Sequence, residues 1–63
     1  MPTIRPGSLR YDAATGFFEA RVDVQRDGRT FRYPARVAAP QGADPAWVAD
    51  ALARHALRMS DSR

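Results

Sequence analysis

Apolar and polar residues alternate along residues 17–38, on both sides of Asp27-Gly28. Asp-Gly between two alternating runs is the strongest short-range signal for a β-hairpin, because both residues accept the positive φ of a type I′ turn. If these two residues form the loop, Arg26 lies opposite Arg29 and the register of the hairpin follows. Four apolar pairs then share one face: Val24–Phe31, Val22–Tyr33, Ala20–Ala35 and Phe18–Val37.

The opposite face of the hairpin pairs Asp23 with Arg32 and Glu19 with Arg36, so opposite charges meet twice. In the same register Pro34 falls on a pair that is not hydrogen-bonded, and its nitrogen points away from residues 17–25. Proline is tolerated there only if no strand pairs on its far side. Residues 31–37 are therefore predicted to be an edge strand.

A further strand is predicted at residues 8–12, which alternate in phase with the hairpin, and residues 12–16 read as a turn. A four-residue loop places Tyr11 opposite Phe18 and Leu9 opposite Ala20, on the apolar face. Arg10 then lies opposite Glu19, which gives a cross-strand row of Arg10, Glu19 and Arg36. Residues 8–38 are thus predicted to form a three-stranded antiparallel meander in the order 1-2-3.

A helix is predicted at residues 44–59, because Asp44-Pro45 is typical of a helix N-cap followed by the first helical residue. Its apolar stripe should cover the apolar face of the sheet, which defines an α+β domain of the βββα type. The residues of that stripe are Val48, Ala51, Leu52, His55, Ala56 and Met59.

Two apolar helix residues, Leu57 and Trp47, fall outside that stripe. Leu57 is either a single exposed residue or part of a small face on which a second helix packs. Trp47 either covers the edge of the core, with its N–H in solvent, or anchors a partner. Because one helix covers only part of such a sheet, we expect a homodimer through the helix layer. The residues of this predicted partner face are Ala46, Trp47, Ala53 and Leu57.

The chain has 63 residues and no cysteine, so a single domain over residues 1–63 without disulfides is expected. Residues 1–7 are rich in proline and glycine and are predicted to form a flexible arm. We predict neither a signal peptide nor a membrane span, and a cytoplasmic location. The net charge is +3 and every basic residue is arginine. That bias fits nucleic-acid binding, but it is also typical of GC-rich codon usage.

No catalytic or metal-binding arrangement is predicted. His55 is the only histidine and lies on the predicted core stripe, where a packed role is expected. Three or four ligands are usual for a metal site, and the sequence offers no second histidine and no cysteine. Turn, cap and cross-strand roles account for most of the carboxylates. We therefore expect a non-enzymatic domain without a cofactor or a small-molecule substrate.

Several arginines gather on the predicted polar side of the sheet, called here the outer face. Its predicted residues are Ser8, Arg10, Glu19, Arg21, Asp23, Arg32, Pro34 and Arg36, with Arg26 and Arg29 at the hairpin tip. A three-stranded sheet followed by one helix resembles the plan of plant AP2-type domains and of integrase amino-terminal arm domains. The resemblance implies a sheet face laid into the major groove of DNA, with arginines on phosphates and guanines. The tryptophan and glycine positions of that family's sheet are not reproduced, and no aromatic side chain is expected on this face.

Two functions follow from these patterns. The first is a protein-interaction or self-associating module, whose partner is a second copy or another protein. The alternative is double-stranded DNA binding through Arg10, Arg21, Arg26, Arg29, Arg32 and Arg36.

Overall fold

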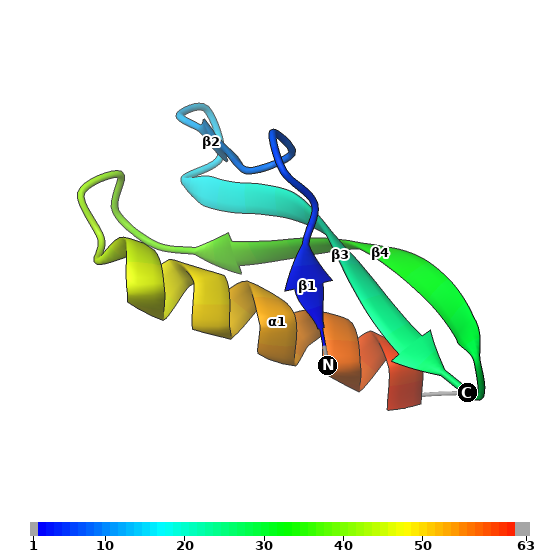
Figure 1. Ribbon diagram of the computed structural model, residues 1–63. Coiled ribbons are helices and arrows are strands. Elements are labelled where there is room, and N and C mark those ends of the chain that lie inside the picture. Colours follow the sequence, from blue (N-terminus) through cyan, green and yellow to red (C-terminus); the bar gives the residue numbers. More distant parts are fainter. Residues whose placement is uncertain (1, 62–63) are drawn as a thin grey trace.

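The computed structural model describes residues 2–61 as one antiparallel sheet of four strands with a C-terminal helix (Figure 1). The predicted α+β class is confirmed, but the sheet has four strands where three were expected. The central strand β3 pairs with β4 on one side and with both β1 and β2 on the other. The elements are β1 (Thr3–Ile4), β2 (Arg10–Asp12), β3 (Phe17–Arg26), β4 (Arg29–Ala38) and α1 (Pro45–Asp61).

The β3–β4 hairpin has the predicted register along its whole length, from Phe17 opposite Ala38 to Arg26 opposite Arg29. Its loop residues Asp27 and Gly28 have φ values of 53° and 75°, as a type I′ turn requires. The alternation of side chains fixes this register, because a shift by one residue would move the apolar set into solvent.

The turn between β2 and β3 also forms as predicted. The Asp12 carboxylate accepts a hydrogen bond from the Ala14 N–H at 3.0 Å, and the Asp12 carbonyl accepts one from the Gly16 N–H at 2.8 Å. Gly16 has a φ of 75°, which glycine adopts without a steric penalty. Tyr11 and Phe18 consequently face each other, with ring centroids 4.8 Å apart.

The prediction of a flexible arm over residues 1–7 is wrong for Thr3 and Ile4, which form β1 opposite Asp23 and Val22. A turn over residues 5–8 causes this, with the Ser8 N–H donating to the Arg5 carbonyl at 3.1 Å. Gly7 has a φ of 77° in that turn. β1 and β2 are therefore two pieces of one interrupted strand beside β3. Met1 lies outside the described residues.

The side chain of Ser8 fills the interruption between β1 and β2. Its Oγ accepts a hydrogen bond from the Arg21 N–H at 3.1 Å and donates one to the Arg5 carbonyl at 2.7 Å. The Arg5 N–H in turn donates to the Arg21 carbonyl at 2.8 Å. The predicted strand at residues 8–12 is accordingly shortened to Arg10–Asp12, because Ser8 bonds through its hydroxyl group and the chain bulges away from β3.

The edge position predicted for the last strand is confirmed, since within residues 2–61 β4 pairs with β3 alone. Pro34 lies opposite Arg21, as the register requires. Two residues further along, the Arg36 N–H donates to His55 Nδ1 of α1 at 3.0 Å. This hydrogen bond shows that the Arg36 N–H points away from β3, and that α1 covers this part of the edge.

The helix begins as predicted, with Asp44 Oδ1 accepting from the Ala46 N–H at 3.0 Å and Pro45 as the first helical residue. It continues to Asp61, beyond the predicted end at residue 59. Its buried residues are Val48, Leu52, Ala56 and Ser60.

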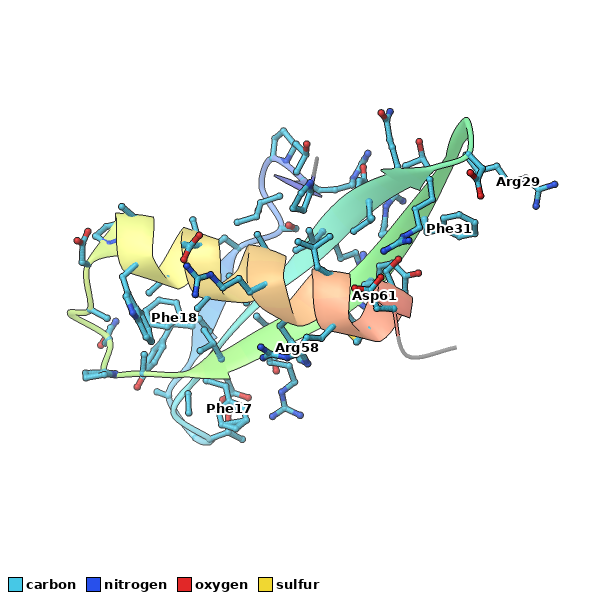
Figure 2. The ribbon with its side chains drawn as sticks, turned by 90° about the horizontal axis from the view of Figure 1, so that it is seen from below. Phe17, Phe18, Arg29, Phe31, Arg58 and Asp61 are labelled. Atoms are coloured by element: carbon cyan, nitrogen blue, oxygen red, sulfur yellow. The ribbon has the colours of Figure 1, made fainter. Side chains whose placement is uncertain are left out.

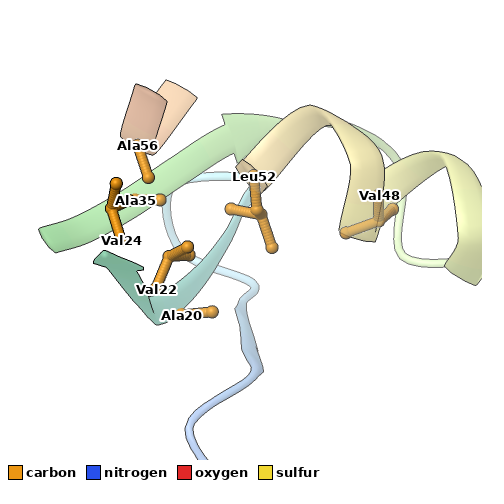
Figure 3. Packing of buried hydrophobic residues seen from close by; sticks show 7 residues of the cluster. All are labelled: Ala20, Val22, Val24, Ala35, Val48, Leu52 and Ala56. Carbon is orange, nitrogen blue, oxygen red and sulfur yellow. The ribbon is translucent and has the colours of Figure 1, made fainter. Parts of the chain in front are cut away.

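The core lies between α1 and the inner face of the sheet (Figure 3). Its buried apolar residues are Ala20, Val22, Val24, Ala35, Val48, Leu52 and Ala56. The buried stripe of α1 is turned relative to the prediction, so that Ala51, His55 and Met59 are only half-buried. Leu57 packs against the core, because α1 also contacts β1, a strand that the sequence did not reveal. Leu9, predicted on the apolar face, is 45% exposed.

Candidate anion-binding face

The outer face of the sheet carries more residues than the sequence predicted. Alternation along β1, β2 and β3 adds Arg5, Asp12 and Phe17 to it. Its charged residues are then Arg5, Arg10, Arg21, Arg32 and Arg36 with Asp12, Glu19 and Asp23. Five arginines against three carboxylates leave an excess of two positive charges.

Asp23 is the most heavily paired carboxylate of the outer face. It lies 3.0 Å from Arg32 Nε, as its predicted pairing requires, and 3.8 Å from Arg5 Nη1. The Arg5 contact was not predicted, because only the pairing of β1 with β3 brings Arg5 to this face. All three side chains are partly exposed, so each pair stabilises the fold by about 0–1 kcal/mol.

The predicted row of Arg10, Glu19 and Arg36 has the expected register but only one ion pair. Arg36 Nε lies 3.9 Å from a Glu19 carboxylate oxygen. The Arg10 guanidinium has no carboxylate within 4.0 Å among the described residues. The row therefore leaves Arg10 available to an external anion.

The expectation that no aromatic side chain lies on the outer face is wrong. Phe17 has the same alternation as Glu19 and Arg21, and the Arg36 guanidinium carbon lies 4.3 Å from the centroid of its ring. Figure 2 shows Phe18 beside the helix and Phe17 further from it. The ring restricts the Arg36 side chain through a cation–π contact.

An open hollow of about 430 Å³ lies on the outer face, between the 5–8 turn and the middle of β3 and β4. Its polar lining comes from Ser8, Arg10, Glu19, Arg21 and Arg36, and its apolar lining includes Pro34. The Arg21 guanidinium, like that of Arg10, has no carboxylate within 4.0 Å in the part of the chain that the structure describes. The hollow thus brings together three arginines and one carboxylate.

Arg26 and Arg29 do not belong to the outer face, although they were predicted to extend it. Alternation along β3 and β4 places both with the inner, core-facing residues. The Arg26 guanidinium forms an ion pair with the Asp61 carboxylate at the end of α1. Arg29 remains at the hairpin tip, as Figure 2 shows.

The residues of the predicted partner face do not form one exposed patch. Ala46 and Trp47 are exposed, whereas Ala53 and Leu57 are half-buried and Leu57 packs against the core. Trp47 is 52% exposed and is not among the side chains packed against the core, so it does not cover the core edge.

Within residues 2–61, no group of three or more histidine, cysteine, aspartate or glutamate side chains is placed to hold a metal ion. The His55 Nδ1 atom accepts the hydrogen bond from the Arg36 N–H. The ring therefore binds the edge of β4. Because Nδ1 accepts this hydrogen bond, the ring proton lies on Nε2.

No protein-family model matches the chain, and no curated protein or solved structure matches it either. Among the described residues, α1 is not long and apolar enough to cross a membrane.

Proposed function

We propose that this chain is a non-enzymatic domain that binds the phosphate backbone of double-stranded nucleic acid through the outer face of its sheet. The observation that carries the proposal is the hollow, where Arg10 and Arg21 have no carboxylate partner among the described residues. An arginine without an internal partner forms a bidentate contact with phosphate without first breaking an ion pair.

The shape of the β3–β4 hairpin supports this proposal. The major groove of B-DNA is about 12 Å wide and admits a two-stranded ribbon, and residues 24–31 of the hairpin extend as such a ribbon beyond the pairing of β3 with β1. Each strand of the hairpin has ten residues, and their outer side chains include Arg21, Arg32 and Arg36. The ion pairs with Asp23 and Glu19 hold Arg32 and Arg36 across the ribbon, with their side chains about half exposed.

The proposal is tested by fluorescence anisotropy with a labelled DNA duplex of mixed sequence, at low and at physiological salt. Backbone binding predicts a dissociation constant in the range of about 10⁻⁶–10⁻⁴ M at physiological salt, and much tighter binding at low salt. The double variant Arg10→Ala/Arg21→Ala should weaken binding and make the slope of log K against log salt shallower by about two.

The matched control is Arg54→Ala/Arg58→Ala, which removes the same charge from the exposed side of α1. This variant should retain most of the binding if the outer face is the contact surface. Equal losses in the two double variants would point to a general effect of net charge and would contradict the proposed surface. An anisotropy that does not change at low salt would contradict nucleic-acid binding itself.

We propose protein binding through Trp47 as a second candidate function, because this large aromatic side chain is 52% exposed beside the exposed Ala46. Tryptophan is enriched at the energetic centres of protein interfaces. If Trp47 joins two copies, Trp47→Ala should lower the average mass measured by light scattering at high concentration. An unchanged mass would exclude a homodimer through this side chain.

A further inference from the structure

The outer edge of β4 is closed at one end and open at the other. Pro34 has no N–H, and the Arg36 N–H donates to His55 Nδ1. Residues of the same alternation, Thr30 and Arg32, also direct their N–H and C=O groups away from β3. These N–H and C=O groups of Thr30 and Arg32 have no hydrogen-bond partner among the described residues.

The open part of this edge is residues 29–33, bounded by the Asp27-Gly28 turn and by Pro34. Its middle residue is Phe31, and the two outward-facing residues, Thr30 and Arg32, lie symmetrically on either side of it. Such a segment is complementary to a second copy of itself in antiparallel orientation, as a twofold axis requires.

We propose that two copies of the chain associate by pairing their β4 strands at residues 29–33, with Phe31 opposite the partner's Phe31. In this register Thr30 and the partner's Arg32 form a hydrogen-bonded pair. Arg32 and the partner's Thr30 form the second, symmetric pair. Four main-chain hydrogen bonds result, two from each pair. The sheets of the two copies then form one continuous sheet.

The side chains of the open segment fit this register. Phe31 is only half-buried and is not among the residues packed against the core. A non-hydrogen-bonded pair brings its ring close to the partner's Phe31, where aromatic pairs stabilise a sheet. On the same face Arg29, which has no carboxylate within 4.0 Å among residues 2–61, lies opposite the ring of the partner's Tyr33, a cation–π arrangement. Figure 2 shows Arg29 and Phe31 near the hairpin tip.

Neighbouring registers are less favourable. Centring the pair on Arg32 places two guanidinium groups directly opposite each other and sets Thr30 against a proline without an N–H. Centring it on Thr30 brings the positive-φ Gly28 into the ladder. In the favoured register no two arginines are directly opposite, and each Arg32 keeps its own Asp23 at 3.0 Å.

The association rests on the fold alone and does not depend on the proposed nucleic-acid binding. It is measured without nucleic acid by sedimentation velocity, over protein concentrations up to about 1 mM, because so short a ladder gives weak association. Thr30→Pro removes one outward N–H from each copy but leaves the β3–β4 ladder and the ion pairs intact. It should weaken association roughly tenfold or more. Thr30→Val, which keeps the N–H, is the matched control and should associate like the unmodified chain.

The register is tested separately by disulfide formation, because the chain has no cysteine of its own. A non-hydrogen-bonded antiparallel pair has Cα atoms about 4.5 Å apart, within the range for a disulfide. Phe31→Cys should therefore form a covalent dimer on mild oxidation far faster than Arg29→Cys, whose counterpart in the partner is Tyr33. Equal rates for the two cysteine variants would overturn the register, and equal sedimentation of Thr30→Pro and Thr30→Val at every concentration would overturn the association.

Discussion

Replacing Ser60 with alanine should stabilise this domain, although the residue is buried. The side chain of Ser60 is at the end of α1 on its buried stripe, and the residue is only 6% exposed. Its Oγ atom has no hydrogen-bond partner among the described residues. Folding therefore removes this hydroxyl group from water without replacing the hydrogen bonds that it made there.

The size of the effect follows from three contributions. An unsatisfied buried polar group costs about 1–3 kcal/mol, and Ser60→Ala removes that cost. Alanine is also the better helix former by up to about 0.7 kcal/mol. The small void left by the missing oxygen atom opposes both. We expect a net stabilisation of about 1–2 kcal/mol, which raises the Tm by about 4–8 °C for each kcal/mol in a domain of this size.

The free energy of unfolding is measured by urea titration and thermal melting with circular dichroism. Ser8→Ala is the matched comparison, because it makes the same chemical change where the hydroxyl group bonds both Arg5 and Arg21. Ser8→Ala should destabilise the fold by about 0.5–1.5 kcal/mol. If Ser60→Ala lowered the Tm, the Ser60 hydroxyl would have a hydrogen bond in solution and the reasoning would be refuted.

Three further substitutions test the core, the turn and the edge. Leu52→Ala removes a side chain that is 0% exposed and should cost about 2–5 kcal/mol, against a total of about 3–9 kcal/mol for so short a chain. Its Tm, followed by circular dichroism, should fall by about 10 °C or more, and an unchanged Tm would contradict the central place of Leu52 in the core. Gly28→Ala should lower the Tm, because the φ of Gly28 is 75° and alanine adopts that conformation only with strain. Gly42 has no positive φ, so Gly42→Ala should leave the Tm unchanged. Equal changes in Tm for the two variants would contradict the role of the turn. His55→Leu should accelerate hydrogen exchange at the Arg36 amide, and an unchanged rate would show that this hydrogen bond does not protect the edge.

The hairpin was predictable because its determinants are local. A type I′ turn sets the register, and alternation then assigns each side chain of β3 and β4 to a face. The edge position of β4 followed from Pro34, and the start of α1 from Asp44-Pro45. Four of the six arginines assigned to the nucleic-acid face lie on the outer face for the same reason.

The rest depended on contacts between distant parts of the chain. Thr3-Ile4 is too short to alternate visibly, so neither β1 nor the place of Arg5 on the outer face was predictable. Because β1 was not predicted, its contact with α1 was not predicted either. This contact explains why the buried stripe of α1 is turned and why Leu57 packs against the core. The ion pair of Arg26 with Asp61 was not predictable, because the two residues are 35 positions apart in the sequence. The faces of Phe17, Arg26 and Arg29 did have a local signal, since alternation along β3 and β4 assigns each of these residues to a face.

The interruption of the strand beside β3 also affects how the domain opens. Because the 5–8 turn separates β1 from β2, no continuous ladder links their detachment from β3. β1 pairs with Asp23 and Val22 of β3, whereas β2 pairs with residues 17–19 of β3. Each half of the central strand therefore has its own neighbour on this side, and we expect the two to open in separate steps, joined by the hydrogen bonds of Arg5 and Ser8 to Arg21. On its other side β3 is paired with β4 along its whole length, so we expect the hairpin to be the last part of the sheet to lose its protection against exchange.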